Sequence, residues 1–221
     1  MKVGIIGSGN MGGGLARRIA SAGHDVQMTA RDLAKAEKIA KEIGQKVKIV
    51  PIGEIGKGVD VLIAATPAGS QAEALRNAGD LNGKIVIDIA NPLKPDFSGL
   101  SVGFSTSFAE ELSKQVPGVK IVKAFNTVFA QVLSEGPDFG SGLSAAAFYC
   151  GDDGGAKKTV HALIESMGFD AIDAGPLSNA RYLEPMGFLN IWFGYTAKRG
   201  TGISLNLVKR GEGKGGKVKA A

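Results

Sequence analysis

The chain has 221 residues, of which 44% are hydrophobic and 21% charged, as is ordinary for a folded globular protein. It contains no apolar run near the roughly 18 residues that a membrane helix requires, and its first residues do not resemble a secretion signal. The single cysteine excludes an internal disulfide and suits a reducing compartment. These features predict a cytoplasmic protein that makes no contact with membranes.

The formal net charge of +5 is concentrated at the C-terminal end. Residues 207–221 account for +4 of it, because they contain five basic side chains and one acidic side chain (Lys209, Arg210, Lys214, Lys217 and Lys219 against Glu212). The rest of the chain is close to neutral and offers little support for a nucleic-acid partner. We expect residues 209–221 to form a flexible basic tail.

A glycine-rich turn between a predicted strand and a predicted helix is the strongest local pattern. Residues 2–6 are an apolar run typical of a buried strand, and the segment that follows reads Gly7-Ser8-Gly9-Asn10-Met11-Gly12. In this context the first glycine permits the tight turn, the second lets a pyrophosphate approach the backbone, and the third lets the helix pack closely. The helix N-terminus adds free N–H groups and a positive dipole end. The pattern therefore predicts a bound dinucleotide.

The end of the second predicted strand, at residues 25–29, indicates which dinucleotide is bound. A site for NAD usually has Asp or Glu there to accept a hydrogen bond from the ribose 2′-hydroxyl. This strand ends in Thr29 and is followed by Arg31, whose guanidinium suits a 2′-phosphate, and Lys35 adds charge one turn into the next helix. We therefore predict NADP(H). In the alternative, Arg31 is solvated and Asp32 binds the ribose, although Asp32 lies one residue further from the strand end.

Apolar strands and amphipathic helices alternate along the chain, which predicts a parallel sheet with helices on both faces. In chain order we expect a helix at 33–43, strands at 47–50 and 59–65, a helix at 71–80, a strand at 84–89, a helix at 108–115, strands at 120–124 and 144–150, a helix at 154–167 and a strand at 170–173. Residues 93–107 and 134–143 read as irregular segments. The predicted fold is α/β: a Rossmann-like, doubly wound, mainly parallel sheet with a short C-terminal helical element.

The last part of the chain differs in character from the rest. Residues 179–198 carry apolar side chains on more than one side of a predicted helix, and such a helix must be buried by another surface. It could cover the open edge of the sheet, pack on a second subunit, or form one wall of a substrate cleft. We expect an NADP-binding domain at 1–175 and a C-terminal helical element at 176–208, ahead of the basic tail.

Ligands of an open α/β sheet bind beyond the carboxyl ends of its strands. The predicted strands in the middle of the chain end in small or uncharged polar residues: Thr66-Pro67, Ala90-Asn91-Pro92 and Asn126-Thr127. We expect no catalytic acid or base and no metal site, because His24, His161 and Cys150 lie elsewhere and Asp152 and Asp153 read as helix caps. Hydride exchange between two carbon-centred cofactors needs mainly close stacking and correct orientation, which these residues suit.

One run near the C-terminus is more specific than the glycine turn. Residues 150–183 include Asp173-Ala174-Gly175-Pro176-Leu177-Ser178-Asn179-Ala180-Arg181. Together with the glycine turn and the Thr29-Ala30-Arg31 ending, this segment resembles the coenzyme F420-dependent NADP oxidoreductase family over nearly the whole chain. The resemblance implies reversible hydride transfer between NADPH and the deazaflavin coenzyme F420, and a homodimer in which the C-terminal helix takes part.

The resemblance also implies roles for individual residues. Contacts to the NADP phosphates and ribose are implied for Ser8, Asn10, Met11, Thr29, Arg31 and Lys35. The route to the nicotinamide would be lined by Thr66, Pro67, Ala90 and Asn91, beside Pro92.

Some segments depart from the archaeal deazaflavin enzymes of that family. Residues 88–93 and 123–127 are more similar to bacterial relatives and to the reductase modules attached to membrane ferric reductases. Trp192, Phe193 and Tyr195 are bulky where a deazaflavin needs room. Two alternatives therefore stay open. One is an NADPH-dependent reductase of a flavin, quinone, metal chelate or small carbonyl, and the other is a sensor that binds NADPH without oxidising it.

Overall fold

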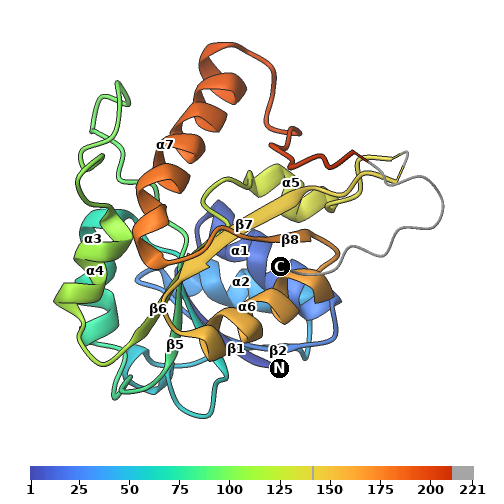
Figure 1. The fold of residues 1–221 in the computed structure, drawn as a ribbon. Coiled ribbons are helices and arrows are strands. Elements are labelled where there is room, and N and C mark those ends of the chain that lie inside the picture. The colour runs from blue at the N-terminus through green and yellow to red at the C-terminus, as the bar shows by residue number, and fades with distance from the viewer. Residues whose placement is uncertain (141, 211–221) are drawn as a thin grey trace.

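The computed structural model describes all residues except 141 and 211–221 and contains an eight-stranded sheet with the order β3-β2-β1-β4-β5-β6-β7-β8 (Figure 1). The strands are β1 (Lys2–Ile6), β2 (Asp25–Thr29), β3 (Val47–Ile49), β4 (Val61–Ala64), β5 (Ile85–Asp88), β6 (Lys120–Ala124), β7 (Ala146–Gly151) and β8 (Asp170–Asp173). Strands β1 to β6 are parallel, which confirms the predicted Rossmann-like sheet. β7 pairs antiparallel with β6 and parallel with β8, so these two strands run the opposite way. The predicted basic tail lies outside the described residues from position 211 onward.

Helices cover both faces of the sheet. They are α1 (Asn10–Ser21), α2 (Leu33–Ile43), α3 (Ala68–Arg76), α4 (Phe108–Gln115), α5 (Ala130–Glu135), α6 (Gly154–Ser166) and α7 (Ala180–Ile191), with a π-helical turn at Trp192–Thr196. One hydrophobic core lies under α1, α2, α5 and α6 and includes Leu15 and Leu163. The other lies under α3, α4 and the start of α7 and includes Leu112 and Leu183. None of the described helices is long and apolar enough to cross a membrane.

Before α7, the largest differences between the observed and the predicted elements concern α3 and α5. The helix expected at 71–80 lies at Ala68–Arg76 and begins directly after Pro67, whose fixed φ is compatible with a helix N-terminus. Helix α5 is absent from the prediction because it is too short to show a periodic pattern. It packs against α1 so closely that a Cβ on Gly14 would lie 3.1 Å from the Leu133 side chain.

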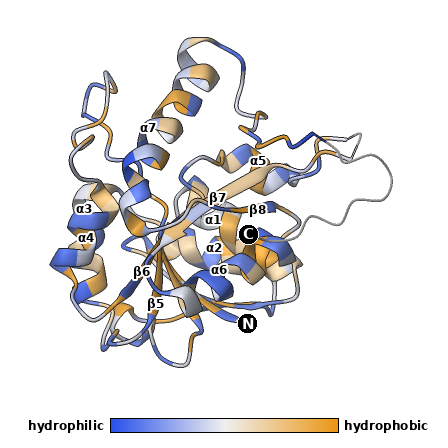
Figure 2. Cartoon of the chain, viewed as in Figure 1, coloured by the Kyte–Doolittle hydropathy of each residue, from blue (hydrophilic) through white to orange (hydrophobic). Residues whose placement is uncertain are grey.

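Only one side of α7 is covered by the rest of the described chain. Tyr182 is 72% exposed, and Leu189 and Trp192 are each nearly half exposed. Figure 1 shows α7 projecting from the sheet with its last turn farthest away, and Figure 2 shows apolar and polar residues mixed along it. The predicted helix at 179–198 therefore exists, but its apolar surface is not buried all round within the described residues.

A buried network of three charged side chains fixes the start of α7. The Lys123 ammonium at the end of β6 is fully buried, donates to Asp88 Oδ2 at 2.7 Å and to the Ala90 carbonyl, and lies 3.0 Å from Glu184 Oε1. Glu184, on α7, also accepts the main-chain N–H groups of the first two residues of α4. Burial by itself lowers the pKa of Lys123, but the two carboxylates outweigh it and raise the pKa above its usual value. The carboxylates therefore favour the protonated form of Lys123, and the hydrogen bonds of the network join β5, β6, α4 and α7.

Replacing Lys123 by Met is expected to lower the free energy of unfolding by about 3–5 kcal/mol, because two carboxylates are then buried without their cation. The matched control is Lys120→Met on the same strand. Lys120 pairs with Asp153 at the surface, so the expected loss there is about 1 kcal/mol or less. Urea unfolding followed by circular dichroism measures both values, and equal losses would show that the buried network does not stabilise the fold.

Candidate functional site

A cavity of about 910 Å³, which we call the main cavity, lies between the carboxyl ends of β1, β4, β5 and β6 and the α7 helix. It brings together eight of the predicted site residues: Gly9, Asn10, Met11, Lys35, Thr66, Pro67, Ala90 and Asn91. The other six lie outside its lining: Gly7, Ser8, Gly12, Thr29, Arg31 and Pro92. The main cavity thus lies at the carboxyl edge of the parallel strands, which is where the sequence predicts that a ligand binds.

The glycines of the predicted turn are required for different geometric reasons. Gly7 has a φ of +123°, and a Cβ there would lie 2.4 Å from the Ala65 carbonyl oxygen. A Cβ on Gly12 would lie 2.1 Å from the Gly7 carbonyl oxygen, so only glycine lets α1 approach the turn this closely. A Cβ on Gly9 would meet no atom of the described chain within 4 Å. The space beside Gly9, at the N-cap of α1, is therefore open to a ligand, as phosphate binding requires.

The residues expected to select NADP lie around the end of β2. Thr29 is 3% exposed, and its carbonyl accepts the Gly7 N–H at 2.8 Å, so the strand end and the glycine turn are joined. Arg31 and Lys35 are exposed. Asp32 caps α2, because its carboxylate accepts the Lys35 N–H at 3.0 Å. This cap engages Asp32 in the helix and makes it a poorer ribose ligand than the alternative prediction assumes.

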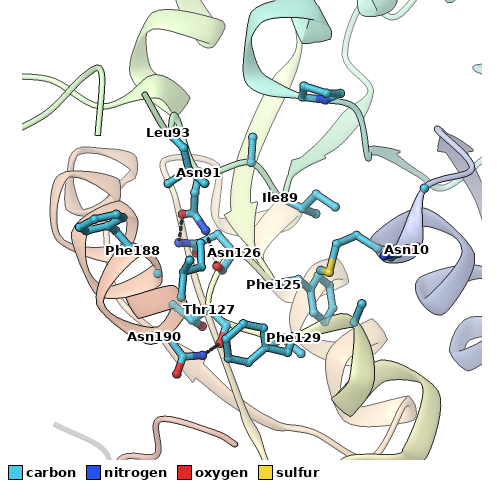
Figure 3. A pocket seen from close by; sticks show the side chains of 18 of the residues that line it. Asn10, Ile89, Asn91, Leu93, Phe125, Asn126, Thr127, Phe129, Phe188 and Asn190 are labelled. Carbon is cyan, nitrogen blue, oxygen red and sulfur yellow. Dashed lines mark hydrogen bonds between the residues drawn. The ribbon is translucent and has the colours of Figure 1, made fainter. Parts of the chain in front are cut away.

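Two asparagines at neighbouring strand ends form a reciprocal amide pair (Figure 3). Asn91 donates to the main-chain oxygen of Asn126 at 2.7 Å, and Asn126 donates to Asn91 Oδ1 at 3.0 Å. The same Asn126 nitrogen donates to the Leu183 carbonyl of α7 at 2.7 Å. A Cβ on Gly187 would lie 2.6 Å from Asn91 Oδ1, so α7 needs glycine here to pack on the pair. The ends of β5 and β6 and the α7 backbone therefore meet at one point of the main cavity.

Phe125 precedes this pair in an unusual backbone conformation. Its φ of +59° lies in the left-handed region, which is rare for a bulky side chain and costs on the order of 1–3 kcal/mol. The ring is fully buried and packs edge to face against Phe169, with 6.2 Å between the ring centroids. The conformation turns the chain at the end of β6, directly before Asn126 and Thr127. Backbone strain of this kind is concentrated at functional sites.

Several oxygen atoms of cavity residues are buried without a hydrogen-bond partner among the described residues. They are Thr66 Oγ1, Asn126 Oδ1, Thr127 Oγ1 and Asn190 Oδ1. The Asn190 nitrogen donates to the Thr127 carbonyl at 2.9 Å, which orients that amide (Figure 3). An unpaired buried polar atom costs about 1–3 kcal/mol, and native proteins contain few of them. Their concentration around one cavity is typical of a site that binds a polar ligand.

One side of the main cavity is aromatic. It is formed by the rings of Phe97, Phe129, Phe188, Trp192 and Tyr195. The rings of Phe129 and Tyr195 pack edge to face, with centroids 6.0 Å apart. A Cβ on Gly194 would lie 2.7 Å from the Phe129 ring, so the π-helical turn lies directly against that ring. Turns of this kind are frequent at functional sites, and the aromatic side suits a planar ligand.

Within the described lining, the main cavity has no carboxylate, imidazole or thiol, and its ionisable side chains are those of Lys35 and Tyr195. His161 lies on α6, where it forms a 3.0 Å hydrogen bond with Tyr149. No group of three or more His, Cys, Asp or Glu side chains in the described chain is arranged to hold a metal ion. The chemistry that this lining supports best is the binding and orientation of planar groups.

Asp152 and Asp153, which the sequence predicts to be helix caps, have different roles. Asp153 caps α6 as predicted, because its carboxylate accepts the Ala156 N–H at 2.7 Å. Asp152 instead accepts the Leu177 N–H at 2.8 Å and so holds the segment that leads to α7. The prediction of a cap on the following helix was therefore wrong for Asp152.

Sequence reasoning missed the site residues that come from distant segments. Gly187 and Asn190 lie on α7, and Phe129 directly precedes the unpredicted helix α5. None of them belongs to a recognisable local pattern. The sequence does contain one signal for this part of the site. Asn126 and Thr127 directly follow a predicted strand, and this position predicts that they lie at the carboxyl edge of the sheet.

Comparisons with known proteins identify relatives of this chain. The family model for "NADP oxidoreductase coenzyme F420-dependent" matches residues 2–92. The F420-dependent NADP reductase of Methanothermobacter thermautotrophicus is 30% identical over 200 residues, which cover 83% of this chain and 85% of that protein. The metalloreductase STEAP3 of Rattus norvegicus is 31% identical over 193 residues, which cover 86% of this chain but only 38% of that protein. A crystal structure from Arthrobacter sp. FB24, of a proposed F420-dependent NADP reductase, has a TM-score of 0.83 and 28% identity and covers 95% of this chain and 100% of that one.

Gly9→Val is expected to abolish dinucleotide binding and leave the fold intact, because the new side chain enters the open space beside the turn. Gly12→Val is the contrasting variant. It is expected to cost about 3 kcal/mol of stability, because its side chain overlaps the Gly7 carbonyl. Thermal unfolding and fluorescence titration with NADPH separate the two effects. Unchanged NADPH binding by Gly9→Val would show that the turn is not the phosphate site.

Proposed function

Because the chain belongs to the coenzyme F420-dependent NADP oxidoreductase family, we propose that it transfers a hydride between NADPH and a deazaflavin of the coenzyme F420 type, with the two rings stacked directly. The main support is the composition of the main cavity. It has the glycine turn at one end and aromatic side chains at the other, and its described lining contains no carboxylate or imidazole between them. Such a lining suits a reaction that depends on orientation of two planar groups.

The glycine turn suits the pyrophosphate of NADP(H). A Cβ on Gly9 would meet no atom of the described chain within 4 Å, which would let a phosphate approach the backbone there. The main-chain N–H groups of Asn10 and Met11 begin α1 and would donate to the phosphate oxygens. Ser8, which is 6% exposed, adds a hydroxyl next to this backbone.

The two ends of the dinucleotide would then lie on either side of the turn. The 2′-phosphate would lie at the end of β2, between the exposed cations Arg31 and Lys35, with Thr29 beneath. The nicotinamide would lie over the ends of β4 and β5, lined by Thr66, Pro67, Ala90, Asn91 and Pro92.

The second ring would lie between the nicotinamide and the aromatic side of the cavity. Bound NADPH supplies a hydride, and the acceptor ring takes up that hydride together with a proton from water. Phe129, Phe188 and Trp192 would hold the plane of the acceptor ring parallel to the nicotinamide at stacking distance. The unpaired oxygens of Asn126 and Asn190 would accept hydrogen bonds from ligand N–H groups.

We also propose that two copies of the chain associate through the exposed side of α7. Tyr182, Leu189 and Trp192 present apolar surface there. The segment between β5 and α4, which rises beside α7 in Figure 1, adds Phe97 at 68% and Phe104 at 91% exposure. Exposed apolar surface of this extent marks interaction sites. Light scattering of the purified protein measures the mass of the assembly, and a monomer at all concentrations would contradict the proposal.

A metal chelate is the second candidate for the electron acceptor. The similarity to the metalloreductase STEAP3 favours it, although this chain matches 38% of that protein. A ferric chelate in the same NADPH oxidation assay tests it directly.

Mixing the protein with NADPH and oxidised coenzyme F420 is expected to bleach the visible band of the deazaflavin rapidly. NADH in place of NADPH is expected to give a much slower reaction, because it lacks the 2′-phosphate. A free flavin and a ferric chelate serve as parallel acceptors. Tight NADPH binding with no bleaching would overturn the deazaflavin as substrate and keep the NADP site. Tight NADPH binding with no NADPH oxidation in the presence of any of the acceptors would leave only the sensor interpretation.

Arg31→Ala is expected to weaken NADPH binding by about 1.5–3 kcal/mol, the value of a charged hydrogen bond, and to change NADH binding little. Arg76→Ala is the matched control, because Arg76 is likewise exposed but lies in the last turn of α3, at the end of that helix away from the carboxyl edge of the sheet. Fluorescence titration measures both affinities. A parallel fall in NADPH and NADH affinity would show that Arg31 does not bind the 2′-phosphate.

A further inference from the structure

Residues 93–106, which we call the flap, form part of the wall of the main cavity but do not pack in the two hydrophobic cores. Leu93 and Phe97 line the cavity. None of the apolar side chains of the flap belongs to either core or packs against it in the described chain. The hydrogen bonds that residues 93–105 form with other described residues all have their partners at 91–105. The flap is therefore held by its own local bonds and by its two ends, and it rises beside α7 as a separate loop (Figure 1).

Both ends of the flap are fixed. Just before it, Asn91 forms the reciprocal amide pair with Asn126. Just after it, the buried Ser107 caps α4, because its hydroxyl accepts the Glu110 N–H at 3.2 Å, and Glu184 accepts the N–H groups of the first two residues of that helix. A segment with two fixed ends and no core contacts between them can move as one piece at a low cost in free energy.

The backbone of the flap does not match its own sequence. Phe97 and Phe104 have φ values of +58° and +61°, in the left-handed region that is costly for a bulky side chain. Gly99 and Gly103 lie outside that region, and a Cβ on either would meet no atom within 4 Å. The flap thus has phenylalanine where glycine is favoured and glycine where any residue fits. A conflict of this kind indicates that the segment has a second conformation.

The described position of the flap leaves one side of the main cavity open to solvent. Phe97 and Trp192 both line the cavity, yet they are 68% and 43% exposed. An exposed ring gains little hydrophobic free energy, so the strain at Phe97 is not compensated in this position. Water that enters here opposes the close, dry stacking on which hydride transfer depends. A second position of the flap that buries Phe97 would remove both disadvantages.

We propose that the flap closes over the main cavity when NADP(H) and the acceptor are bound, so that the Phe97 ring covers the stacked rings and excludes water. Gly99 and Gly103 supply the backbone freedom for this movement. The inference rests on the proposed function, because only a filled cavity offers Phe97 a surface on which to pack. Closure of this kind holds the reactants together until the hydride has moved, so it acts on kcat more than on dinucleotide binding.

Hydrogen–deuterium exchange followed by mass spectrometry measures the closure directly. NADP⁺ and oxidised coenzyme F420 are added together, because two oxidised partners bind without exchanging a hydride. Amide exchange in peptides from residues 93–106 is then expected to slow at least about tenfold. Peptides from residues 7–12 report dinucleotide binding at the glycine turn. Residues 79–83, which lie outside the lining of the main cavity, are the reference whose exchange stays unchanged.

Two glycine variants test whether the movement itself is needed. Gly99→Ala and Gly103→Ala fit the described conformation and restrict the backbone, so each is expected to lower kcat about fivefold and to change the Kd for NADPH less than about twofold. Gly154→Ala is the matched control. A Cβ on Gly154, in the first turn of α6, also meets no atom within 4 Å, and the residue lies outside the lining of the main cavity. Its kcat is expected to stay unchanged.

A variant of the flap ring tests what closes on the substrates. Phe97→Ala is expected to lower kcat about tenfold and to leave NADPH binding unchanged, because it removes the cover and not the glycine turn. Phe139→Ala, which removes another exposed ring outside the lining of the main cavity, is the matched control. Loss of association in light scattering with an unchanged kcat in Phe97→Ala would overturn the flap and assign this ring to the surface between two copies.

The outcomes separate the flap from the proposed function. Bleaching of coenzyme F420 without slower exchange at 93–106 would overturn the flap and leave hydride transfer untouched. An unchanged kcat in Gly99→Ala, Gly103→Ala and Phe97→Ala would do the same. Slower exchange at 7–12 with no bleaching would overturn the deazaflavin as acceptor, and with it the closure of the flap on that acceptor.

Discussion

The position of the candidate site depends on one buried cation. The Lys123 ammonium has two carboxylate partners, Asp88 and Glu184, and donates to the Ala90 carbonyl. The second negative charge is tolerated because Glu184 also accepts N–H groups at the positive end of α4. Every strong donor and acceptor in the network is used, so the arrangement is specific as well as buried. It ties the loop after β5, which lines the main cavity, to α7, which forms the cavity's opposite side.

The parts of the fold that could be predicted are those with local signals. The bounds of β1, β2, α2, α4, β6 and β8 agree with the sequence prediction, because each element has a clear apolar pattern and a cap or breaker at its ends. The glycine turn is likewise a local pattern, and Gly7 and Gly12 have the geometric reasons that the pattern implies, whereas Gly9 leaves open space beside the turn. The strand ends located the main cavity because parallel strands share one carboxyl edge.

The rest depends on contacts between distant residues. The reversed direction of β7 and β8 follows from where the chain re-enters the sheet, which no short window shows. Lys123 reads in sequence as one polar residue in an apolar strand, and its partners Asp88 and Glu184 lie far from it along the chain. The left-handed backbone at Phe125 and the close approach at Gly187 are visible only when α7 lies on the ends of β5 and β6. Most of the α7 side of the main cavity could therefore not be predicted from the sequence.

The glycine turn and α7 form different sides of the main cavity, and this difference is relevant to substrate specificity. The family model matches residues 2–92, which include the glycine turn and the loop after β5 but not α7. Helix α7 is fixed at its start by Glu184 and Gly187, whereas its end and the π-helical turn project from the sheet with Trp192 and Tyr195 exposed. Substitutions near that end can change the shape of the aromatic side of the main cavity without disturbing the glycine turn. The glycine-turn side and the aromatic side of the main cavity are thus held by different contacts, so that either side can change in shape without the other.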